Sequence, residues 1–258
     1  MKFFYNALFH TMRDPGETIT NLLVDDRGII VDTLSILPDS FQGEKIDLQE
    51  SHVFPGFTDT HTHSFEGGLY SFAANLGHCR SLSDLFAELK NYEPIDGILV
   101  GFNFDENLIG EKRFPSKKEL DTHFPYIPVL LRRIDGHSVQ INSKLKQMIE
   151  EWGNITLPGN EPYRGKWNDY VCHQFHRNIS EDWVVKAYKR GATIGIKSGH
   201  TTIHSMIGDA ASDPLHYQLI AEMKGEFALD LILYPQLFDV NRALQLKSHR
   251  VGGCILAD

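Results

Sequence analysis

The chain has 258 residues, which is enough for one large domain or one domain with a smaller partner, and enough to bury a substantial core. Its 34 acidic residues outnumber its 25 basic residues, and no cluster of Lys or Arg offsets the net charge of -9. Nucleic acid and anionic membranes are therefore poor candidate partners. The three cysteines are far apart and odd in number, which favours a reduced compartment without a disulfide framework.

The amino terminus does not resemble a signal for export. Asn6 and His10 interrupt it before the apolar core of a signal peptide could form. No run of about 18 apolar residues occurs along the chain, so the sequence predicts no membrane-spanning helix. We therefore expect a cytoplasmic protein.

Residues 1–52 predict a small β-domain. Short runs rich in β-branched and aromatic residues are separated by polar turns, and Asp26-Arg27-Gly28 between two of them is typical of a hairpin. The expected strands are 2–9, 19–24, 29–34 and 45–48. A lone meander of this size would be only marginally stable, so we expect it to pack on another part of the protein.

The next stretch, residues 53–64, reads VFPGFTDTHTHS and contains the most informative motif of the chain. Asp59, His61 and His63 occur at every second residue, so on a strand they would share one face. Two neutral imidazoles on a rigid support suit a divalent metal ion. The alternative is two polar histidines on a half-exposed edge strand.

The middle of the chain predicts both helices and buried strands. Apolar residues at helical spacing follow Ser81, Ser116 with Glu119 forms a capping-box pattern, and a helix is expected from Asn142 or Ser143 to about Trp152. Near-continuous apolar runs predict strands at 98–104 and 129–134. Gly, Pro, Asn and aromatic residues at 154–178 predict a long loop.

The last third alternates helix and strand with short connections, as in βα units of a parallel sheet. A helix is expected from Ser180 to Arg190, ended by Gly191, and two more open at Asp213 and Asp239. The expected strands are 201–206, 228–234 and 253–257.

A series of short motifs follows one after another along the chain. They are Pro55-Gly56-Phe57-x-Asp59-x-His61-x-His63, 101–105 (GFNFD), Leu120-Asp121, 128–131 (PVLL), Asp135-Gly136-His137-Ser138 and Asn142-Ser143. The series resembles the amidohydrolase superfamily of metal-dependent hydrolases, and in particular its amidohydrolase 3 branch, typified by N-substituted formamide deformylase. The resemblance covers essentially the whole chain.

The resemblance implies an α/β fold, a (β/α)₈ TIM-type barrel of which this chain holds about strands 1–4. Residues 1–52 would be part of a composite β-sandwich made from both chain ends, and residues 53–258 an incomplete barrel. An insertion at about 65–181 would lie over the barrel mouth. The strands at 201–206, 228–234 and 253–257 would be barrel strands 2, 3 and 4.

The resemblance also implies a reaction. Water activated by one or two divalent metal ions, zinc above all, would attack a C–N bond other than a peptide bond, such as an amide or formamide. His61 and His63 would be metal ligands. Asp59 would orient them, although a solvated carboxylate near a turn is the alternative.

The Asp-Gly-His-Ser stretch would face the substrate from the insertion. His137 would reach the substrate, supported by Asp135 and Asn142. The alternative is that Asp135 and Asn142 only cap the following helix.

The sequence departs from the family pattern at two places. Cys254 stands where relatives carry a Lys whose carbamate bridges two metals, and it is either a thiolate ligand in place of that bridge or a buried apolar residue. The chain ends at Asp258, whereas relatives continue with four more strands that carry two histidines and the general-base aspartate. We therefore expect a fragment or truncated gene product with weak metal binding and little turnover.

Two hypotheses remain open at this point. The first is a metal-dependent amidohydrolase, impaired by truncation, that acts on a small-molecule amide; whether it is a monomer or a homo-oligomer stays open. The second is a non-catalytic remnant that serves as a binding or self-associating module through the exposed edge of strand 4. A barrel-type phosphoesterase fits less well, because the β-domain and the Asp-Gly-His-Ser insertion argue against it.

Overall fold

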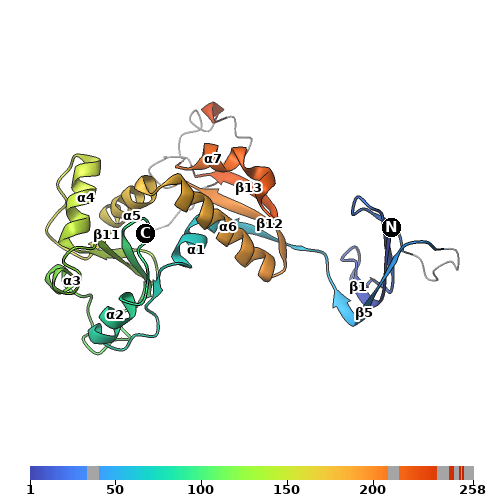
Figure 1. Cartoon of the computed structure of the whole chain (residues 1–258), viewed down its shortest axis with the longest axis horizontal. Coiled ribbons are helices and arrows are strands. Elements are labelled where there is room, and N and C mark those ends of the chain that lie inside the picture. Colours follow the sequence, from blue (N-terminus) through green and yellow to red (C-terminus); the bar gives the residue numbers. More distant parts are fainter. Residues whose placement is uncertain (34–40, 209–214, 237–243, 247–249, 251, 253–258) are drawn as a thin grey trace. The chain divides into compact units, whose positions relative to one another are not determined.

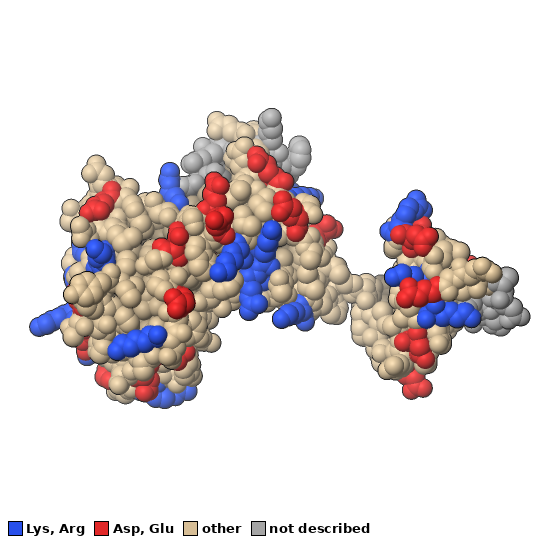
Figure 2. Space-filling view, in the orientation of Figure 1, with Lys and Arg blue, Asp and Glu red and all other residues tan. Residues whose placement is uncertain are grey.

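The computed structural model describes residues 1–33, 41–208, 215–236, 244–246, 250 and 252 (Figure 1). The chain divides into two compact units, Met1–Phe57 and Thr58–Asp258. Over the described ranges, none of the helices is both long and apolar enough to cross a membrane. Acidic and basic side chains are interspersed on the visible face of each unit (Figure 2).

The first unit is a five-stranded sheet organised around β1 (Lys2–His10). On one side β1 pairs antiparallel with β2 (Thr18–Ile19) and β3 (Leu22–Val24), and β4 (Ile30–Asp32) pairs with β3. On the other side β1 pairs in parallel with β5 (Glu44–Val53).

This unit extends to Phe57, whereas the sequence suggested a β-domain that ends at residue 52. The reason is that β5 continues to Val53, which pairs with Phe9 of β1. Val53 therefore belongs to the sheet of the first unit and not to the strand that carries the His-x-His motif. Pro55-Gly56 separates β5 from the next strand, β6 (Phe57–Thr62).

The second unit contains a five-stranded mixed sheet in the order β11-β10-β9-β8-β7. The strands are β7 (Ala74–Asn75), β8 (Leu99–Phe104), β9 (Val129–Arg133), β10 (Ser138–Ile141) and β11 (Tyr163–Arg164). β7, β8 and β9 run parallel, and β9, β10 and β11 antiparallel. Because successive side chains of a strand point to opposite faces of the sheet, β9 contributes to two cores. Leu130 belongs to one buried apolar cluster and Leu131 to the other.

Four helices accompany this sheet. They are α2 (Leu82–Leu89), α3 (Lys117–His123), α4 (Ser143–Gly153) and α5 (Lys166–Asn178). The capping box of Ser116 and Glu119 is present at the start of α3, as the sequence predicts.

The prediction of a loop over 154–178 is wrong, because α5 occupies its second half. Val171, Cys172 and Phe175 lie on one face of α5 and are buried in the core. The Gly, Pro and Asn residues that suggested a loop lie mainly before this helix, over residues 153–165. Tertiary burial of one apolar face therefore outweighed the polar composition of the segment.

A second, three-stranded sheet has the order β13-β12-β6. β12 (His200–Ile207) and β13 (Asp230–Pro235) pair in parallel, close to the strands predicted at 201–206 and 228–234. Immediately after β13, Gln236 forms a further parallel bridge with Gly252. The strand predicted at 253–257, with Cys254, lies outside the described residues.

The three-stranded sheet is accompanied by α1 (Ser64–Tyr70), α6 (Glu181–Lys197), α7 (Tyr217–Glu222) and a short 3-10 helix (Lys224–Glu226). In Figure 1, α6 crosses β12. Gly191 was expected to end this helix, but α6 continues through it. A Cβ atom at Gly191 would collide with the carbonyl oxygen of Ser64, and one at Gly68 with that of Ala187. These glycines therefore permit close contact between α1 and α6.

Candidate functional site

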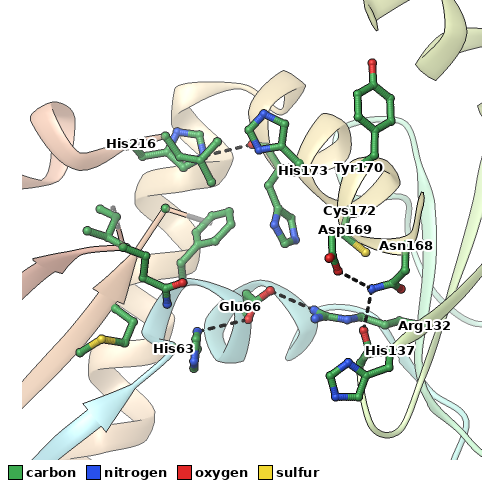
Figure 3. Close-up of a pocket in the computed structure, with 18 of the residues that line it drawn as sticks. His63, Glu66, Arg132, His137, Asn168, Asp169, Tyr170, Cys172, His173 and His216 are labelled. Atoms are coloured by element: carbon green, nitrogen blue, oxygen red, sulfur yellow. Dashed lines mark hydrogen bonds and ion pairs between the residues drawn. The ribbon is translucent and has the colours of Figure 1, made fainter. Parts of the chain in front are cut away.

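A cavity of about 470 Å³ lies where strands of the three-stranded sheet end. His63 follows β6, Met206 and Ile207 end β12, and Gln236 follows β13. The turn between β9 and β10, one face of α5, and residues of α1 and α6 also line it (Figure 3). In α/β proteins, the carboxyl ends of parallel strands are where ligands usually bind.

His61 and His63 lie close together, with ring centroids 5.4 Å apart in an edge-to-face arrangement. The sequence predicted that both would lie on one strand, but β6 ends at Thr62 and His63 is the N-cap residue of α1. Both histidines are exposed, but His63, with a side chain that is 43% exposed, lines the cavity and His61 does not. Burial lowers the pKa of His63, which favours the neutral ring that binds metals.

Asp59 supports the backbone at this position. Its Oδ1 atom accepts a hydrogen bond from the backbone N–H of His61, at 3.0 Å. This bond holds the pKa of Asp59 below its ordinary value.

Across the described ranges of the chain, no group of three His, Cys, Asp or Glu side chains is arranged to hold a metal ion.

Asp135, Gly136 and His137 of the Asp-Gly-His-Ser stretch line the cavity from the turn between β9 and β10, and Ser138 begins β10. Asp135 accepts a hydrogen bond from the backbone N–H of His137 at 3.0 Å and pairs with Arg133. Asn168 of α5 donates to the carbonyl oxygen of Gly136 at 3.0 Å, and Gly136 has a φ of +76°, which a residue with a side chain rarely adopts. Hydrogen bonds from within the turn, at Asp135, and from α5, at Asn168, thus hold the turn in place.

Asn142 does not line this cavity, although it was a candidate for substrate binding. It is fully buried, and its Oδ1 atom accepts hydrogen bonds from the N–H groups of Val129 and Leu145, each at 3.0 Å. Its Nδ2 atom donates to the carbonyl oxygens of Phe124 and Ile127. The alternative interpretation applies: Asn142 caps α4 and ties it to β9.

Among the charged residues of the cavity that were not anticipated from the sequence, Glu66 and Arg132 form a connected pair beside His63. Glu66 in α1 lies 3.6 Å from Nδ1 of His63, and its other oxygen accepts a hydrogen bond of 3.0 Å from Arg132 of β9 (Figure 3). Burial alone would raise the pKa of Glu66, but the charge of Arg132, the nearby His176 and His63 and the hydrogen bond from Arg132 together outweigh burial and hold the pKa below its ordinary value. The signal in the sequence that could have revealed Glu66 was its spacing of three residues from His63, which is about one helical turn.

Buried polar groups continue from this pair toward α5. The guanidinium of Arg132 lies over the ring of Tyr70, 5.1 Å from its centroid, and the Tyr70 hydroxyl lies 3.2 Å from Nε2 of the buried His176. Nearby, burial raises the pKa of the Cys172 thiol to about 11, so this cysteine is protonated at neutral pH. His204 stacks on Tyr234 instead of lining the cavity.

Residues 44–246 match the amidohydrolase family, and this range covers most of the chain. The chain belongs to the amidohydrolase family. The resemblance inferred from the motifs is therefore confirmed. Over 259 aligned residues, the chain is 30% identical to the protein named "Putative amidohydrolase YtcJ" of Bacillus subtilis (strain 168), with 91% of this chain and 49% of that protein covered.

Two crystal structures share the fold of this amidohydrolase-family chain. They are uncharacterized metal-dependent hydrolases from Pyrococcus horikoshii OT3, with a TM-score of 0.74, and from Pyrococcus furiosus, with a TM-score of 0.72. Both are 20% identical to the chain and match 98% of it, with 52% and 53% of their own lengths covered. The chain thus spans about half the length of the proteins that it resembles.

Proposed function

We propose that this chain carries part of a metal-dependent hydrolase site that acts on a C–N bond other than a peptide bond, of the amide or formamide type. The observation that carries the proposal is the position of His63, beside His61 and at a cavity built from the carboxyl ends of β6, β12 and β13. A cavity of about 470 Å³ is of the size that small-molecule ligands occupy.

We further propose that β6, β12 and β13 are the first three strands of an incomplete (β/α)₈ barrel. Their order in the sheet follows their order along the chain, as it does in such barrels, and β12 and β13 are parallel. The bridge between Gln236 and Gly252 continues this order on the far side of β13. In this proposal the five-stranded sheet belongs to the insertion, about residues 65–181, and residues 1–57 form the separate β-domain.

The donor types at His61 and His63 fit a divalent metal ion, and zinc accepts imidazole nitrogen readily. A third ligand is not among the described residues, and Cys254 lies outside them. Because catalytic zinc sites usually have three protein ligands, we expect this chain alone to bind zinc weakly. When bound, such an ion would lower the pKa of a coordinated water to about 7 and polarise a carbonyl group.

Each candidate residue has a role in this proposal. His61 and His63 bind the ion, and Asp59 fixes the backbone that presents His61. His137 faces the cavity from the opposite side, where its ring can hydrogen-bond a small amide substrate, and Asp135 orders its turn. Substrate would thus lie between the strand ends and the β9–β10 turn.

Metal binding by the purified chain tests this proposal. Zinc would be added to chelator-treated protein, and its stoichiometry and affinity measured by elemental analysis and competition with a chromophoric chelator. We expect His61→Ala and His63→Ala each to lower zinc affinity strongly. His78→Ala is the matched control, because His78 is exposed and lines no part of the cavity. Equal zinc binding by the parent and both site variants would overturn the assignment.

A second measurement separates an enzyme from a binding module. The parent chain would be incubated with zinc and a set of N-formyl amines and simple amides, and released amine would be quantified. Release that depends on His61 supports the hydrolase. Zinc binding without release supports the alternative, a non-catalytic binding or self-associating module.

A further inference from the structure

We infer that Glu66 is a positioning residue for His63, and that Arg132 holds Glu66 in the orientation this role requires. The inference rests on the proposed function, because it assumes that His63 is a metal ligand. Glu66 lies outside the His-x-His motif, and it reaches His63 from the next turn of the chain, in α1.

The geometry places one oxygen of Glu66 against one particular nitrogen of His63. Oε2 of Glu66 is 3.6 Å from Nδ1 of His63, which is ion-pair range and slightly longer than a hydrogen bond. A carboxylate on that side favours the proton at Nδ1, so the lone pair that binds metal resides at Nε2. Metal-bound histidines commonly donate their other ring N–H to a carboxylate in this way.

Arg132 fixes the carboxylate itself. Its Nη1 atom donates to Oε1 of Glu66 at 3.0 Å, and the two side chains are only 20% and 29% exposed. The guanidinium also lies over the ring of Tyr70, 5.1 Å from its centroid. One oxygen of Glu66 is therefore committed to Arg132 while the other faces His63 (Figure 3).

The helix that carries Glu66 is itself anchored. The hydroxyl groups of Ser64 and Ser205 are 2.5 Å apart in a buried contact that joins α1 to β12. The close approach of α1 and α6 at Gly68 and Gly191 limits movement further. Glu66 and His63 are thus held at a defined separation by the fold, as a positioning role needs.

The competing explanation is a purely structural ion pair that joins α1 to β9. The chain offers a matched control in Glu106 and Arg133, which pair at 2.8 Å with side chains that are both 21% exposed. Arg133 is next to Arg132 in β9, but neither Glu106 nor Arg133 lines the cavity with His63. A structural role predicts the same behaviour for both pairs, and a positioning role does not.

The test compares Glu66→Gln with Glu106→Gln and includes the double variant Glu66→Met with Arg132→Met. The double variant removes the pair without leaving an unpaired buried charge, so it separates positioning from folding. Zinc affinity would be measured by chelator competition, and the His63 tautomer by ¹⁵N NMR of the metal-free chain. Thermal unfolding would show that each variant is folded.

We expect the double variant to lose about 10- to 100-fold in zinc affinity and Glu66→Gln to lose less. The Nδ1-protonated form of His63 should predominate in the parent and give way to a mixture in the double variant. Glu106→Gln should match the parent in both measurements. Parent-like zinc affinity and tautomer in the folded double variant would overturn the inference. Failure of His63→Ala to weaken zinc binding would instead overturn the proposed function.

Discussion

The two sheets of the larger unit differ in how completely they are covered. In the five-stranded sheet, β10 is buried at every residue and Val129, Leu130 and Leu131 of β9 have no exposed surface. In the three-stranded sheet, by contrast, β6 contains no buried residue, and Phe57 at its start is 52% exposed. The first sheet therefore accounts for much of the apolar burial, whereas the second presents strand ends to a cavity. The five-stranded sheet is thus the more completely buried of the two, and the cavity lies between the strand ends of the three-stranded sheet and the β9–β10 turn.

The largest expected effect is a core truncation that tests this difference directly. Leu130→Ala should lower the free energy of unfolding by about 2–5 kcal/mol, because it leaves a cavity in a fully packed core. Phe57→Ala should change it by only about 0.5 kcal/mol, because that ring is half exposed. Chemical denaturation of both variants measures the difference, and similar losses would show that the two sheets contribute alike.

A smaller effect is expected at Asn142, which lies in the stable region although the sequence suggested a role in binding. Asn142→Ala should cost about 2–3 kcal/mol, because it leaves buried backbone donors and acceptors without partners. Zinc affinity should not change, since Asn142 does not line the cavity. His137→Ala should do the opposite: it should weaken substrate binding and leave the free energy of unfolding near that of the parent. Weakened zinc binding in folded Asn142→Ala would contradict the separation of the two regions.

The smallest effect concerns the helix contact that supports the three-stranded sheet. Gly68→Ala should destabilise the chain by about 1–3 kcal/mol, because the new methyl group collides with the backbone of α6 at Ala187. Gly67→Ala is the matched control in the same helix. A Cβ there has nothing within 4 Å, so this change should be neutral or stabilise by about 0.5–1 kcal/mol. Thermal unfolding of the two variants measures the contrast, and equal melting temperatures would mean that the helices can separate at little cost.

Local signals in the sequence predicted many elements correctly. The capping box at Ser116, the buried run of β9 and the alternation of strand and helix after residue 180 all depend on residues close together in the chain. The errors have a common origin. Gly191 was read as a helix end, but its missing side chain serves a contact with Ser64, which is distant in sequence. The loop predicted over 154–178 becomes partly helical because α5 buries an apolar face in the core.

From the sequence alone came the family, which the comparisons confirm, and the prediction that the pair His61 and His63 and the Asp-Gly-His-Ser stretch belong to the site. Spacing and order along the chain were sufficient for these. Only the tertiary structure showed that His137 and His63 line one cavity, that Asn142 is a helix cap, and that Glu66 and Arg132 form a pair beside His63. These facts depend on side chains from different elements meeting in space. No local pattern encodes such meetings, because they arise from the packing of two sheets and their helices.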